Sequence, residues 1–270
     1  MISRNWAALA VAAAICIPFQ AQAHRTWMLP SATVLSGEDP WVTVDAAVSN
    51  DLFYFEHVPL RIDGLSITAP DGSAAKAENA STGKYRTTFD LHLTQPGTYK
   101  LAMPGKMVVG TYELNGERKR WRGPAEAAAK EIPADAKNVV LTEMHRRLET
   151  FVTAGKPTTD ALKITGQGLE LEPITHPNDL FEGEPAKFRL LLDGKPAAGT
   201  EVEVVPGGVR YRSKPDDTKV TSDQDGVITV TWPTPGMYWI SAEVEDDKTT
   251  VKGAAKRMAV YTATLEVLPQ

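Results

Sequence analysis

Residues 89–99 have the sequence FDLHLTQPGTY, and residues 227–238 have the sequence VITVTWPTPGMY. In both stretches apolar and polar residues alternate, which is typical of a strand with one buried face. A Pro–Gly corner follows, with a tyrosine two residues after the glycine. A tyrosine beside such a corner often packs across the two sheets of a sandwich. The repeat therefore predicts a mostly β protein with two immunoglobulin-like β-sandwich domains.

Further strand patterns lie on both sides of the repeat. Residues 41–46 (WVTVDA) and 188–192 (FRLLL) read as strands, and DGKP at 193–196 reads as the turn that follows the second. Short strands with frequent turn signals are typical of sandwich domains. We therefore expect an N-terminal β-sandwich domain over residues 24–115 and a C-terminal Ig-like domain over residues 168–270.

The middle of the chain, residues 116–167, has a different pattern. Four apolar residues recur there at the spacing i, i+4, i+8 and i+11: Val140, Met144, Leu148 and Phe151. Such a stripe is typical of an amphipathic helix. We expect this region to be a linker that contains one short helix, at residues 137–153.

Residues 1–23 have the pattern of a cleaved secretory signal peptide. Arg4 precedes a short apolar run, and Ala-Gln-Ala at 21–23 forms the cleavage motif, which predicts a periplasmic protein. The run is too short to span a bilayer, so the chain is not expected to be embedded in a membrane. The only cysteine, Cys16, leaves with this segment, which excludes disulfides and thiolate ligands from the mature chain. A net charge of −5 argues against a nucleic-acid partner.

Cleavage after Ala23 would make His24 the first residue of the mature protein. A free N-terminal histidine is a chelator, because its α-amine and a ring nitrogen can close one ring on a single metal ion. The alternative interpretation is that histidine stands first by chance.

Further candidate ligands lie in the segment NDLFYFEH at 50–57. Asp51, Glu56 and His57 are all able to ligate a divalent ion, although the segment also fits a buried aromatic strand that ends in a polar loop. His176 joins the candidates if the two domains fold against each other; otherwise its position before a proline suits a structural turn. Two imidazoles and an amine suit nickel, copper or zinc rather than calcium or magnesium.

Five segments of the mature chain recur in a known family: HRTWMLP at 24–30, GLELEP at 168–173, GE at 183–184, FRLLLDGKP at 188–196 and DQDG at 223–226. Together they resemble the exported DUF4198 proteins, which are also described as nickel-uptake-associated or NikM-like. The resemblance implies periplasmic β-sandwich proteins that work in transition-metal uptake beside envelope transporters. It connects the metal with the N-terminal His-x-x-Trp motif, which here is His24 and Trp27.

These observations favour a non-enzymatic accessory protein that binds nickel, or else copper or zinc, for uptake or handling. Its expected partners are the metal ion and an envelope transporter or TonB-type receptor. One alternative is a structural or carrier Ig-like module of the cell envelope. A remote alternative is a copper-dependent oxygenase with an N-terminal histidine site. The chain has no HExxH, GxSxG or P-loop pattern, so no motif points to another enzyme class.

Overall fold

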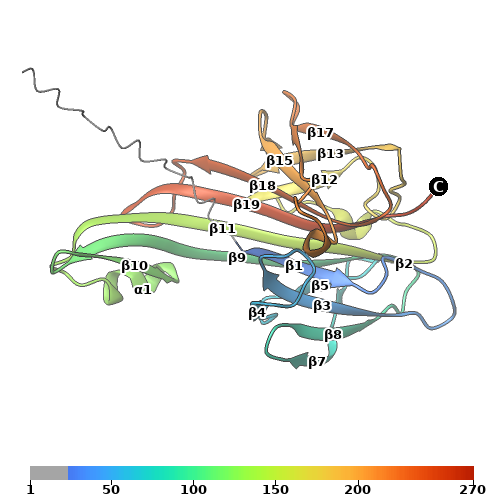
Figure 1. The fold of residues 1–270 in the computed structure, drawn as a ribbon, viewed down its shortest axis with the longest axis horizontal. Coiled ribbons are helices and arrows are strands. Elements are labelled where there is room, and N and C mark those ends of the chain that lie inside the picture. Colours follow the sequence, from blue (N-terminus) through green and yellow to red (C-terminus); the bar gives the residue numbers. More distant parts are fainter. Residues whose placement is uncertain (1–23) are drawn as a thin grey trace, which may run out of the picture.

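The computed structural model describes residues 24–270, which form three β-sheets and one short α-helix (Figure 1). The predicted signal peptide, residues 1–23, lies outside the described residues. The prediction of a mostly β chain with one short helix is confirmed. Within residues 24–270, no helix combines the length and the apolar character that a membrane span requires.

The first sheet has five antiparallel strands from the N-terminal part of the chain. Their order is β1-β3-β8-β7, and β4 also pairs with β3. The strands are β1 (Arg25–Pro30), β3 (Trp41–Ser49), β4 (Val58–Pro59), β7 (Glu78–Thr82) and β8 (Thr87–His92). Phe89 and Leu91 of β8 are buried and alternate with partly exposed neighbours, as the sequence predicts.

The second sheet has ten strands and draws on both halves of the chain. Its order is β16-β15-β18-β19-β11-β9-β5-β6, while β10 pairs with β9 and β2 with β11. The strands are β2 (Val34–Leu35), β5 (Ser66–Thr68), β6 (Ala74–Ala75), β9 (Gly97–Leu114), β10 (Glu117–Gly123), β11 (Lys137–Ala154), β15 (Glu201–Pro206), β16 (Thr218–Thr221), β18 (Gly236–Asp246) and β19 (Ala254–Val267).

The third sheet has four antiparallel strands around β13. They are β12 (Leu169–Pro173), β13 (Pro185–Leu192), β14 (Lys195–Pro196) and β17 (Val227–Thr231). The helix α1 (Ala125–Glu131) follows β10, and two single 3-10 turns are η1 (Asp160–Leu162) and η2 (Val209–Tyr211).

The long sheet forms one wall of two separate hydrophobic cores. The first core lies between the five-stranded sheet and β5, β9 and β11, and includes Val44, Phe89 and Leu101. The second lies between the four-stranded sheet and β15, β18 and β19, and includes Phe188 and Ile240. The two sandwiches thus share a continuous sheet instead of being joined only by a linker.

Each core contains one of the two repeated tyrosines, as the sequence predicts. Tyr99 and Tyr238 are both 1% exposed. The hydroxyl of Tyr99 donates to the carbonyl of Gln95 (3.2 Å), and that of Tyr238 donates to the carbonyl of Thr234 (2.7 Å). In both repeats the tyrosine therefore closes the corner by bonding to the residue four positions earlier.

The prediction of a helix over residues 137–153 is wrong, because these residues belong to β11. The spacing of four between Val140, Met144 and Leu148 is also a multiple of two, so these three residues fit the period of a strand as well. Leu148 and Val152 lie on one face and enter the first core, whereas Phe151 faces the second. The short helix is instead α1. The region 116–167, expected as a linker, thus supplies the strand that joins β9 to β19.

Candidate functional site

The rings of His24 and His57 stack on each other. Their centroids are 3.9 Å apart and the ring planes differ by 18°. His24 immediately precedes β1 and His57 immediately precedes β4, and both strands pair with β3. Because β1 and β4 meet the same end of β3, two histidines that are distant in the sequence reach one exposed surface.

Asn50, at the end of β3, orients the first histidine. Its Oδ1 lies 2.7 Å from Nδ1 of His24, an arrangement in which the ring N–H donates to the amide oxygen. No sequence motif singles out Asn50; the one signal is its place at the start of the segment 50–57, which contains the candidate ligands.

The carboxylate of Glu56 is hydrogen-bonded to the backbone of the loop that carries His57. Its Oε1 accepts hydrogen bonds from the backbone N–H groups of Asn50 (2.8 Å) and Asp51 (2.9 Å). The bond from Asp51 is the main cause that lowers the pKa of Glu56, and it outweighs the opposing effect of burial. Glu56 is therefore ionised, and its carboxylate holds the loop in this conformation.

Asp51 faces a cation from the C-terminal half. Its Oδ2 lies 3.5 Å from Nη1 of Arg210 in η2, and the guanidinium of Arg210 lies 3.9 Å from the ring centre of Tyr54. In the described part of the chain, no group of three or more His, Cys, Asp or Glu is placed to hold a metal ion. The structure thus brings together the two imidazoles but not the carboxylates.

A buried aromatic cluster anchors β1, the strand that follows His24. Trp27 is fully buried, with Phe53 and Phe55 at centroid distances of 5.4 and 5.5 Å. Its Nε1 donates to Oγ of Ser49 (2.8 Å), and Nε1 of Trp239 in β18 donates to the carbonyl of Thr26 (3.1 Å). These contacts hold β1 against β3 and β18 and so fix where His24 emerges.

His176 lies in a different environment. Its Nε2 lies 3.1 Å from Oγ1 of Thr98 and from the carbonyl of Thr158, and its Nδ1 accepts the backbone N–H of Asn178 (3.1 Å). Burial lowers the pKa of His176. These partners describe a residue that holds a turn, and they differ from those of His24 and His57, which are Asn50 and each other.

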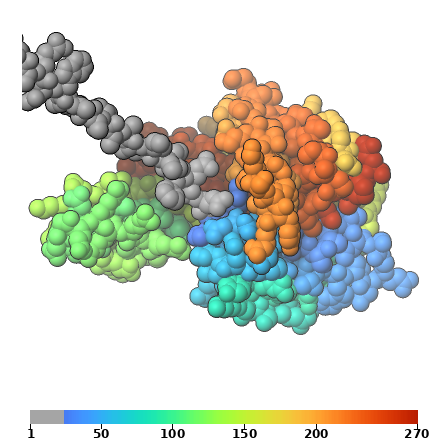
Figure 2. All heavy atoms as spheres, in the orientation of Figure 1, coloured from blue at the N-terminus to red at the C-terminus, as the bar shows by residue number. Residues whose placement is uncertain are grey.

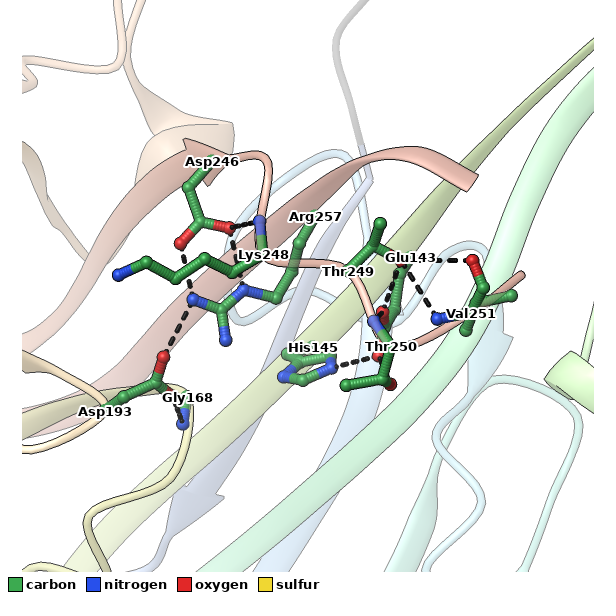
Figure 3. A network of polar contacts seen from close by, with 10 residues as sticks. All are labelled: Glu143, His145, Gly168, Asp193, Asp246, Lys248, Thr249, Thr250, Val251 and Arg257. Carbon is green, nitrogen blue, oxygen red and sulfur yellow. Dashed lines mark hydrogen bonds and ion pairs between the residues drawn. The ribbon is translucent and has the colours of Figure 1, made fainter. Parts of the chain in front are cut away.

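A second polar cluster fastens the β18–β19 connection onto β11 (Figure 3). The carboxylate of Glu143 accepts hydrogen bonds from Thr249 Oγ1 (2.7 Å), Thr250 N (2.6 Å) and Thr250 Oγ1 (2.9 Å), and lies 2.7 Å from Nε2 of His145. Burial raises the pKa of Glu143, but these bonds prevail and lower it from 4.5 to about 2. Every oxygen of the carboxylate is engaged, so the cluster is structural.

A family model described as "Domain of unknown function (DUF4198)" matches residues 21–246. The chain belongs to the DUF4198 family. The matched range includes both stacked histidines, Trp27 and Asn50. No curated protein matches this DUF4198 chain.

Two solved structures with Ig-like folds are distantly similar to this DUF4198 protein. The D0-D1 domain of intimin is 13% identical, covers 89% of this chain and 97% of that chain, and has a TM-score of 0.23. The two tandem V-type regions of VCBP3, a v-region-containing chitin binding protein, are 9% identical, with coverages of 88% and 98% and a TM-score of 0.18.

Proposed function

We propose that this DUF4198 protein is an exported, non-enzymatic accessory protein that binds one late first-row transition metal ion at His24 and His57. Nickel is the first candidate, and copper and zinc are the others. The observation that supports the proposal is the stacking of the two exposed imidazoles at 3.9 Å. We place the protein in the periplasm, where it would exchange the ion with an envelope transporter or a TonB-type receptor.

The distance between the rings suits one shared ion. Metal–nitrogen bonds are about 2.0–2.1 Å long, so two nitrogens on one ion lie roughly 3–4 Å apart. The lone pairs of an imidazole lie in its ring plane, so both side chains would have to turn out of the stacked arrangement to direct one nitrogen of each toward the same ion. Both side chains are exposed, so an ion reaches them without an opening of the fold.

Removal of the signal peptide would add a third nitrogen. Cleavage before His24 frees an α-amine on the residue whose imidazole is already in place. The amine and Nδ1 of His24 could then chelate the ion, with Asn50 Oδ1 giving up its bond to Nδ1. His57 would supply the remaining nitrogen, and binding would depend on processing.

The charges around the site favour nitrogen donors over oxygen donors. Asp51 faces Arg210, and Glu56 is bonded to two backbone N–H groups. A set of neutral imidazoles with an amine suits nickel, copper or zinc, whereas calcium and magnesium require oxygen ligands. The proposed site therefore consists of His24 and His57, without the carboxylates that the sequence analysis included.

Calorimetric titration of Ni(II), Cu(II) and Zn(II) tests the proposal. One sample is protein whose mass confirms that it begins at His24, and the other carries one additional alanine before His24. We expect one ion per chain in the first sample and a loss of affinity of at least about tenfold in the second. Equal affinities would contradict a role of the terminal amine.

Two histidine variants test whether metal binding requires His57 in particular or any histidine of the protein. His57→Ala should abolish stoichiometric binding, whereas His92→Ala should not, because His92 stacks on Trp41 elsewhere on the five-stranded sheet. Loss of binding in both variants would reject the assignment to His57. Hydrogen peroxide production by the copper-loaded protein would instead support the oxygenase alternative.

A further inference from the structure

The strand β10 forms an exposed edge of the long sheet. It pairs with β9 from Glu117 opposite Leu114 to Gly123 opposite Val108, and within residues 24–270 no strand pairs with its other side. Figure 1 shows β9, β10 and α1 extending away from both sandwiches, and Figure 2 shows the same segments as a protruding lobe. An unpaired edge offers backbone N–H and C=O groups to another extended chain.

The charge of β10 is opposite to that of the whole protein. Four of its seven residues, in the sequence ERKRWRG, are basic, whereas the chain has a net charge of −5. Because side chains alternate along a strand, Arg118, Arg120 and Arg122 share one face. Trp121 lies on the other face, where its Nε1 donates to Oε2 of Glu131 in α1 (2.9 Å). The helix thus covers one face of β10, and the arginines lie on the other.

A fourth arginine extends this charged face. Arg146 of β11 is exposed. Partial burial and the positive charge of Arg122 lower the pKa of Arg146, with Glu243 acting in the opposite direction. Arg122 lies opposite Val109, which lies opposite Thr142 of β11. Arg146 is four residues from Thr142, so Arg122 and Arg146 are on the same face of the sheet.

In the described part of the chain, none of the four arginines has a carboxylate within 4.0 Å. Arg118 donates to the hydroxyl of Thr111, and Arg146 contacts the sulfur of Met144. Glu113 lies opposite Arg118, but its carboxylate accepts a hydrogen bond from the side chain of Asn138 (2.7 Å). Within residues 24–270 the three arginines of β10 are therefore in no ion pair, and Glu243 influences Arg146 only from beyond contact distance.

We propose that the free edge of β10 binds an extended acidic segment of a partner protein, which adds to the sheet as a further strand. Alternate residues of a strand are about 6.8 Å apart, so acidic residues at every second position of the segment would match the arginines in spacing. The backbone of the segment would pair with the edge while its carboxylates pair with Arg118, Arg120 and Arg122. Two copies of β10 would repel each other, so the edge favours a different, acidic chain.

An anionic membrane surface would also attract these arginines, but it would leave the backbone edge unused. Lipid headgroups in a fluid bilayer have no fixed spacing and add no strand. The edge and the spacing of the arginines therefore favour a polypeptide, and vesicle binding becomes an outcome of the test.

The test uses the full mature protein and the labelled peptide acetyl-TETETETET-amide, measured by fluorescence anisotropy. We expect saturable binding that weakens as sodium chloride rises from about 50 to about 500 mM. The peptide TTEEEETTT, with the same composition, should bind more weakly because its carboxylates do not alternate. Full N-methylation of the first peptide should abolish binding, since it removes the backbone donors but keeps the charge.

Two triple variants of the protein locate the interaction. R118S/R120S/R122S should lose at least about tenfold in affinity for the peptide. K187S/K195S/K214S, which removes the same charge from exposed sites on other elements, should stay within about twofold. Circular dichroism shows whether both variants keep the β fold.

Three outcomes would overturn the proposal. The N-methylated or the block peptide could bind as well as the alternating one, which would indicate attraction by charge alone. Both triple variants could lose the same affinity. Alternatively, the arginine variant could lose binding only to phosphatidylcholine vesicles that contain about 30% phosphatidylglycerol, which would indicate a membrane contact.

Discussion

Asn50 holds the ring of His24 through a 2.7 Å contact between its side-chain oxygen and Nδ1 of the histidine. The contact connects the end of β3 with the residue that precedes β1, so the ring does not rotate freely above the surface. It also occupies Nδ1, the nitrogen that the proposed chelate would use, so a bound ion must displace this contact. Asn50 therefore competes with the ion for His24, which gives the first prediction.

Replacing Asn50 should strengthen metal binding without unfolding the protein. We expect Asn50→Ala to raise the affinity for Ni(II) or Cu(II) by about two- to tenfold, because the ion no longer has to break the hydrogen bond between Nδ1 of His24 and Oδ1 of Asn50, which contributes about 0.5–1.5 kcal/mol. Calorimetry on the processed protein measures this change. Asn138→Ala is the matched control, since Asn138 binds Glu113 and should leave the metal affinity unchanged. An unaltered affinity in Asn50→Ala would show that Asn50 does not influence metal binding at His24.

Removing the hydroxyl of Ser49 should destabilise the aromatic cluster around Trp27. The indole N–H of Trp27, which is fully buried, would lose its 2.8 Å acceptor. An unsatisfied buried donor costs about 1–3 kcal/mol, so the free energy of unfolding should fall by that amount in Ser49→Ala. Urea denaturation measures it, and Ser213→Ala, at an exposed position, should change stability by less than about 0.5 kcal/mol. Equal stabilities of the two variants would contradict this account.

Glu143 should make stability depend on acid pH. Its pKa falls from 4.5 in the unfolded chain to about 2 in the folded protein, so the folded state favours the carboxylate. The resulting stabilisation, about 2–3 kcal/mol, is complete above pH 4.5 and is lost as the pH falls toward 2. Glu143→Gln should therefore show a smaller loss of stability between pH 5 and pH 2.5 than the parent, as urea denaturation at each pH would measure. Parallel profiles would assign the acid sensitivity to other carboxylates.

Arg257 should contribute more to stability than a typical surface cation. Its side chain is 6% exposed, and Nη2 lies 2.8 Å from Oδ2 of Asp193, while Nε lies 2.9 Å from Oδ1 of Asp246 (Figure 3). Arg257→Ala would leave two carboxylates without their counter-ion. Because Asp193 is 38% exposed, water offsets part of the loss, and we expect about 1–3 kcal/mol.

Thermal and urea unfolding of the Arg257→Ala variant measure this loss. The exposed pair of Arg61 and Asp63 supplies the comparison, and Arg61→Ala should cost less than about 0.5 kcal/mol. A similar effect of the two substitutions would show that burial does not strengthen the Arg257 contacts.

Local sequence patterns predicted several elements correctly. Alternation identified β8 and β17, and the Pro–Gly corners placed Tyr99 and Tyr238 in two cores. The strands and the tyrosine corners depend on residues that are neighbours in the chain, so they can be predicted from one sequence. The helix prediction for β11 failed because a spacing of four residues satisfies both periods, and only the pairing partners of a segment distinguish them.

By itself, the sequence determined three features: the β character of the chain, its tyrosine corners and the position of His24 next to a signal-peptide pattern. Each of these features follows from the order of residues that are close together in the chain. The tertiary structure decided that β11 joins two sandwiches, that His57 meets His24, that Asp51 faces Arg210, and that β10 leaves a basic edge unpaired. The physical reason is that strand pairing forms between segments far apart in the chain. Its register is set by which faces can be buried together, and no local pattern encodes that choice.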